Sequence, residues 1–307
     1  MPPDSQSTFP IVSELTPEPA RSVSTNVNEP IDPDNPRWRL GGAFMVWVAS
    51  LILLVLVPLF FVILYADFYY GLNFGSPRYL HLLRVVATTD RTAFVVQIFA
   101  IAPAHLLTFA LVWALVTRFG QRPFMASLGL GWSGGRSLLV SVGLGVALFV
   151  AATGFIKLLG LDQTPIIEQI MSSRRARFLI AVPAILTAPL VEELVYRGVL
   201  YSALQRVVGV IAAVLVVVML FMLIHLPQHW FDLRGLAIVG MLSIALTIMR
   251  AYTGRLLPCI VLHFVVNGIT YTIFLIAPHL AKVGPSSEQV ASAVLLLANL
   301  RLSMFGL

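Results

Sequence analysis

The chain has 307 residues, of which 58% are hydrophobic and only 11% are charged, and its formal net charge is +6. Soluble domains carry about 25% charged residues, so this composition excludes an ordinary soluble protein and indicates an integral membrane protein. Most of the positive charge lies on arginines between apolar runs, which is typical of contact with the lipid bilayer and not of nucleic-acid binding.

The first segment, residues 1–38, is rich in Pro, Ser, Thr and Asn and holds six of the fourteen acidic residues of the chain. A segment of this composition cannot bury a hydrophobic core, so we expect a disordered N-terminal tail. The first apolar run begins too late and is too long for the core of a signal peptide. It should remain in the protein as a membrane anchor.

Apolar runs of about 18 or more residues predict transmembrane helices. They lie near residues 41–66, 93–117, 137–159, 178–203, 207–226, 235–252 and 256–277, with a weaker eighth run near 286–303. The runs lack the polar alternation of outer-membrane barrel strands. The sequence therefore predicts an all-α, polytopic protein of seven to eight transmembrane helices, located in the cell (inner) membrane.

Strongly polar residues are few inside these runs. An ionisable group at mid-bilayer costs about 2.5–3.5 kcal/mol on insertion scales, so each of them should face the protein interior or a water-filled cavity. They are Gln97 and His105 in the second run, Glu192, Glu193 and Arg197 in the fourth, His225 in the fifth, and His263 and Asn267 in the seventh. His105 stands alone in its helix, and we expect it to form a helix–helix hydrogen bond.

The fourth run contains the stretch PLVEELVYRG at residues 189–198. In a helix, Glu193 and Arg197 are one turn apart and can form a charge pair. Glu192 points about 100° away from Glu193, which leaves its carboxylate available for chemistry. Pro189 removes a backbone donor just before it, so a kink beside Glu192 is expected.

Two later runs each place two motif residues one helical turn apart, Phe221 with His225 and His263 with Asn267. A carboxylate that takes a proton from water, an imidazole that orients this water, and an imidazole with an amide that stabilise an oxyanion are together suited to hydrolysis. With Glu192, these residues predict a catalytic cavity inside the helix bundle.

A metal-dependent alternative uses Glu192, His225 and His263, because two His and one Glu with an open position form a known catalytic zinc site. The HExxH spacing is absent from the chain. We therefore favour direct activation of water and expect no metal, with a divalent ion such as zinc as the alternative cofactor.

Three motifs in this order, EELVYRG (192–198), FMLIH (221–225) and HFVVN (263–267), resemble the EExxxR, FxxxH and HxxxN/B motifs of the CPBP intramembrane proteases. This family includes the type II CAAX prenyl endopeptidases. The resemblance spans about residues 120–277. It implies that Glu192 is the general base, that His225 helps to activate water, and that His263 and Asn267 form the oxyanion site.

The resemblance gives the remaining motif residues supporting roles. Glu193 and Arg197 would support the site without reacting. Tyr196 occupies a position where the family often has Phe, and it would add a hydroxyl group one turn after Glu192.

Four segments follow from these patterns. They are the tail (1–38), the N-terminal transmembrane helices (39–119), a CPBP-like catalytic core (120–277) and a C-terminal helix (278–307). The sequence indicates no oligomeric state.

The predicted function is an intramembrane endopeptidase that hydrolyses a membrane-associated peptide or protein, with prenylated CAAX-type proteins as one substrate class. Two other functions remain open. The chain would be a non-enzymatic immunity or scaffold protein if it keeps only the fold, or a proton-coupled transporter if its buried Glu, His and Arg residues relay protons.

Overall fold

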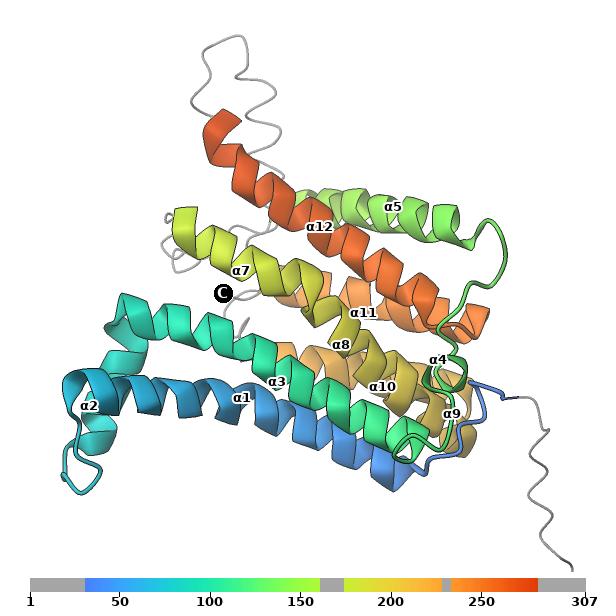
Figure 1. The fold of residues 1–307 in the computed structure, drawn as a ribbon. Helices are drawn as coiled ribbons and strands as arrows, with labels where there is room; N and C mark the ends of the chain where they lie inside the picture. Colours follow the sequence, from blue (N-terminus) through green and yellow to red (C-terminus); the bar gives the residue numbers. More distant parts are fainter. Residues whose placement is uncertain (1–30, 161–173, 228–232, 281–307) are drawn as a thin grey trace, which may run out of the picture. The chain divides into compact units, whose positions relative to one another are not determined.

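The structure is a computed structural model that describes residues 31–160, 174–227 and 233–280, all within the unit Ile31–Leu307 (Figure 1). In these ranges every regular element is helical, which confirms the all-α prediction. The elements are α1 (Leu40–Tyr70), α2 (Tyr79–Thr89), α3 (Arg91–Thr117), α4 (Phe124–Ser127), α5 (Ser137–Leu158), α7 (Arg174–Leu186), α8 (Ala188–Glu193), the π-helix η1 (Leu194–Tyr201), α9 (Ser202–Val208), α10 (Val210–His225), α11 (Leu233–Thr253) and α12 (Leu257–Leu280).

Six helical stretches among the described residues are long and apolar enough to cross a membrane, and they indicate an integral membrane protein. They are α1, α3, α5, the continuous stretch Arg174–Val208, α11 and Leu257–Ile276 of α12. The predicted count of seven to eight is not confirmed, because the run at 207–226 corresponds to α10, which has only 16 residues. The predicted span near 286–303 and most of the predicted C-terminal helix lie outside the described ranges.

The helices pack in pairs that leave apolar surfaces facing outward. In Figure 1, α1 lies along α3, and α12 packs against both α5 and α7. Many Leu, Val and Phe side chains of α1, α3 and α5 are exposed, as expected for surfaces that face lipid. The largest hydrophobic cluster surrounds η1, in which every residue from Leu194 to Tyr201 is buried.

The stretch that carries the predicted glutamates is interrupted. Helix α7 ends at Leu186, and Thr187 precedes α8 with φ −109° and ψ −37°. Pro189 has no N–H group to bond to the preceding turn, so the predicted kink is confirmed, with the break at Thr187. Helix α8 then passes into η1, and π-helical turns are rare and often lie at functional sites.

Residues 31–38 belong to the predicted tail, but they pack against the helices. The carboxylate Oδ1 of Asp34 lies 2.6 Å from a guanidinium nitrogen of Arg250, a side chain that is fully buried. Four further hydrogen bonds hold the segment. Arg250 donates to the Pro33 carbonyl, Gln205 to the Asp34 carbonyl and Arg206 to the Pro36 carbonyl. The Trp38 indole donates to the Val199 carbonyl. The predicted disorder is therefore wrong for residues 31–38, and residues 1–30 lie outside the described ranges.

The substitution Asp34→Ala should lower the free energy of unfolding by about 1–3 kcal/mol, because it leaves the buried Arg250 without its carboxylate partner. Thermal unfolding in detergent measures the change. Asn35 is an exposed residue of the same segment, so Asn35→Ala serves as the control. Equal unfolding temperatures for the two variants would contradict the structural role of the Asp34–Arg250 pair.

Candidate active site

The Glu193–Arg197 pair is formed as predicted. A guanidinium nitrogen of Arg197 lies 3.0 Å from Oε1 of Glu193, and both side chains are fully buried. Arg197 also donates to Oγ of Ser243 at 2.8 Å and to Oγ1 of Thr247 at 3.2 Å, both on α11. The guanidinium carbon lies 4.6 Å from the centroid of the Phe221 ring, which adds a cation–π contact. The charge is therefore held from α8, α10 and α11 together.

Glu193 links this pair to His263 on α12. The Oε1 atom of Glu193 lies 2.9 Å from Nδ1 of His263, and because a carboxylate accepts, the imidazole donates from Nδ1. The opposite nitrogen, Nε2, lies 3.8 Å from Oε2 of Glu192. This distance is longer than a hydrogen bond, so the two groups face each other without a direct bond.

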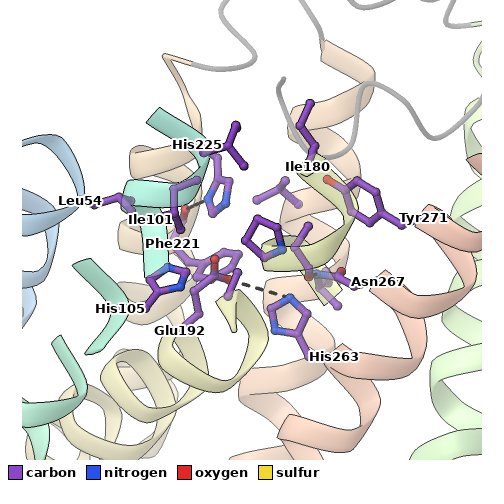
Figure 2. A pocket seen from close by; sticks show the side chains of 16 residues that line it. Leu54, Ile101, His105, Ile180, Glu192, Phe221, His225, His263, Asn267 and Tyr271 are labelled. Atoms are coloured by element: carbon purple, nitrogen blue, oxygen red, sulfur yellow. Dashed lines mark hydrogen bonds and ion pairs between the residues drawn. The ribbon is translucent and has the colours of Figure 1, made fainter. Parts of the chain in front are cut away.

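Glu192 differs from its neighbour in exposure, since 26% of its side chain is accessible while Glu193 is fully buried. Glu192 faces a pocket of about 150 Å³ (Figure 2). Its polar lining consists of all four predicted catalytic residues with two additions, His105 and Tyr271, and the rest is apolar, including Leu54, Ile98, Ile101, Ile180, Pro183, Ala184, Ala188, Phe221, Val239 and Leu242. As expected, Glu192 is therefore accessible from the pocket, whereas Glu193 is buried and paired with Arg197.

His225 lies at the C-terminal end of α10. Its Nδ1 atom is 2.7 Å from the carbonyl oxygen of Phe221, one turn earlier. A carbonyl can only accept, so Nδ1 carries the proton and Nε2 is the basic nitrogen of the neutral ring. The Phe221 ring lies 4.7 Å from the imidazole, centroid to centroid, and helps to fix its orientation.

Asn267 lies one turn after His263 on α12 and contacts α7. Its Nδ2 atom donates to the carbonyl oxygen of Ala184 at 2.8 Å. An amide nitrogen has two N–H groups, so one more donor remains at the edge of the pocket. The Oδ1 atom of Asn267 is buried and has no hydrogen-bond partner among the described residues.

Tyr196 does not line the pocket. Its hydroxyl accepts a hydrogen bond of 2.9 Å from the indole of Trp47 on α1, and its ring packs edge-on against Phe221 at 5.0 Å between centroids. Tyr196 therefore connects η1 to α1 and α10. The expectation of a hydroxyl group beside Glu192 has no support in the pocket geometry.

The alternative metal site was predicted to use Glu192, His225 and His263. Within the described parts of the chain, no group of three or more His, Cys, Asp or Glu side chains is arranged to hold a metal ion. The reaction proposed for Glu192 therefore uses no metal ion.

Sequence reasoning missed Ser243, Thr247 and Trp47, which hold Arg197 and Tyr196 in place. Uncharged hydroxyl and indole groups in apolar runs cost little, so they gave no signal of their own. The spacing of Ser243 and Thr247, one helical turn apart, is the only local pattern that marks a shared face.

The substitution Arg197→Met should lower the free energy of unfolding by about 3–5 kcal/mol, because it leaves the Glu193 carboxylate buried without its cation. The unfolding temperature and the yield of folded protein in detergent measure this loss. Arg136 is exposed, and Arg136→Met provides the matched control. If both variants unfold at the same temperature, the pair does not stabilise the fold.

Comparison with known proteins identifies a family model that matches part of the chain. Residues 174–269 match the family model described as Type II CAAX prenyl endopeptidase Rce1-like. No curated protein and no solved structure matches the chain. The matched range begins at α7 and ends within α12, so it contains all four predicted catalytic residues but is narrower than the expected 120–277. Residues 174–269 are therefore a domain of the Rce1-like type II CAAX prenyl endopeptidases, a family of membrane proteases.

Proposed function

We propose that the protein is an intramembrane endopeptidase in which Glu192 acts as the general base toward water. The observation that carries this proposal is the unequal environment of two adjacent carboxylates. Glu193 is fully buried and bonded to Arg197 and His263, whereas Glu192 lines the pocket. A carboxylate without a hydrogen-bonded counter-charge, in a pocket between apolar helices, is costly, and proton transfer accounts for its presence.

In the proposed reaction, a water molecule binds between the Glu192 carboxylate and Nε2 of His225. Glu192 takes a proton from the water, and the oxygen attacks the carbonyl carbon of the peptide bond. When the peptide bond breaks, the same proton passes from Glu192 to the leaving amine. The proton balance therefore closes, and the water supplies the hydroxyl group of the new carboxyl end.

The oxyanion of the tetrahedral intermediate needs donors on the other side of the carbonyl. In this proposal one donor is the second N–H group of Asn267, since the first is bound to the Ala184 carbonyl. His263 donates from Nε2 whenever its ring is doubly protonated, while Nδ1 remains on Glu193. Both donors lie on the same face of α12, one turn apart.

The proposed substrate is a membrane-associated peptide or protein. Most of the pocket lining is apolar, which favours a peptide bond flanked by apolar side chains. The description of the family model supports a prenylated CAAX-type chain as the substrate class.

The substitution Glu192→Gln should lower cleavage by about 10²–10⁴-fold, the usual contribution of a general base, while the protein still inserts and folds. Mass spectrometry of all membrane-protein termini, in cells that carry equal amounts of wild type or variant, measures the loss and identifies the substrates at the same time. Asp32→Asn provides a matched exchange of an exposed carboxylate for an amide. Identical termini in wild-type and Glu192→Gln cells would contradict the proposal and favour a binding or transport function.

Treatment with a strong chelator should leave the rate of cleavage within about twofold of the untreated rate, because general-base activation of water needs no metal. The measurement uses purified protein after exhaustive dialysis, with and without added Zn²⁺. A loss of activity that Zn²⁺ restores would instead support a metal-dependent site.

A further inference from the structure

His105 connects α3 to the interrupted stretch that carries Glu192. Its Nδ1 atom lies 2.8 Å from Oγ1 of Thr187, which confirms the expected helix–helix hydrogen bond. The hydroxyl of Thr187 donates its proton to the carbonyl of Pro183 at 3.3 Å. It therefore accepts from His105, and Nδ1 carries the proton. His105 belongs to none of the three motifs, and it lies outside the range that matches the family model.

Thr187 lies between the end of α7 at Leu186 and the start of α8 at Ala188. Its N–H group donates to the Pro183 carbonyl at 3.1 Å, and its own carbonyl accepts from Val191 at 3.1 Å. Its side chain makes no capping bond to α8, because the hydroxyl is bound to His105 and Pro183 instead. Pro189 cannot add a main-chain bond across this joint. The hydrogen bond from α3 is therefore an anchor for a locally weakened backbone.

The positions of two groups in the proposed reaction, Asn267 and Glu192, both depend on the joint between α7 and α8 at Thr187. Ala184, three residues before Thr187, supplies the carbonyl that binds Asn267. Glu192 lies five residues after Thr187, and Figure 2 shows His105 beside Glu192, on the opposite side from His263 and Asn267. A shift of the joint would thus move the general base and the oxyanion donor relative to each other.

We propose that His105 is a positioning residue for peptide hydrolysis. Through its bond to Thr187 it fixes the joint between α7 and α8, and thereby the relative placement of Glu192 and Asn267. This inference rests on the proposed function of Glu192. It makes α3 a necessary part of the site, although α3 lies outside the matched domain.

The hydrogen bond between His105 and Thr187 can be removed by a substitution at either residue, and a second substitution at His105 can restore it. Thr187→Val keeps the shape of the side chain without the hydroxyl, and His105→Leu removes the imidazole. In His105→Asn, the amide takes the place of Nδ1 and can donate to Thr187 again. His81 is an exposed histidine on α2, so His81→Asn provides the matched control.

The test uses the full chain in lipid nanodiscs and a fluorogenic farnesylated peptide that ends in a CAAX sequence. A second readout, deuterium exchange of the backbone amides at residues 184–191, reports on the joint without needing activity.

Thr187→Val and His105→Leu should each lower kcat about 5- to 50-fold, with KM within twofold, and should speed exchange. The double variant should be no slower than the slower single variant, because both remove one shared bond. His105→Asn should restore kcat to within about threefold of wild type.

Two results would overturn the proposal. One is wild-type kcat and wild-type exchange in Thr187→Val. The other is a His105→Asn variant as slow as His105→Leu with wild-type exchange, since His105 would then act through Nε2 inside the pocket. Equal cleavage by wild type and Glu192→Gln would instead reject the proposed function. The exchange of residues 184–191 would then still decide whether His105 holds the joint.

Discussion

The buried ion pair between Arg197 and Glu193 determines how the rest of the site is arranged. Both side chains are fully buried in an apolar bundle, where a lone charge would be costly. Ser243 and Thr247 bind the guanidinium from α11, and His263 binds the carboxylate from α12. One charge pair therefore joins three segments of the chain and leaves Glu192 as the carboxylate that faces the pocket.

Helices outside the matched domain complete this arrangement. Trp47 of α1 binds the hydroxyl of Tyr196, Leu54 of α1 lines the pocket, and His105 of α3 holds Thr187. The N-terminal segment adds a further connection through Asp34 and Arg250 on α11. The α8–η1 stretch is thus held on several sides, although its backbone is irregular at Thr187 and again from Leu194 onward. Rigid support of this kind would keep the proposed general base and the proposed oxyanion donors correctly placed.

The local part of the site was predictable from spacing alone. Glu193 and Arg197 stand one turn apart and pair as expected, and the kink near Pro189 follows from its missing donor. The tertiary partners were not predictable, because helices that are apolar on every side carry no amphipathic pattern to orient them. The bond between Trp47 and Tyr196 joins residues 149 positions apart. The packing of residues 31–38 was also missed, because it depends on hydrogen bonds that composition does not reveal.

The central claim is that Glu192 acts in catalysis whereas Glu193 stabilises the fold. The most direct test measures both cleavage and thermal unfolding for Glu192→Gln and Glu193→Gln. The account predicts that Glu192→Gln unfolds at the wild-type temperature but does not cleave, and that Glu193→Gln unfolds at a lower temperature because Arg197 loses its counter-charge. The reverse pattern, with cleavage by Glu192→Gln and wild-type stability of Glu193→Gln, would contradict it.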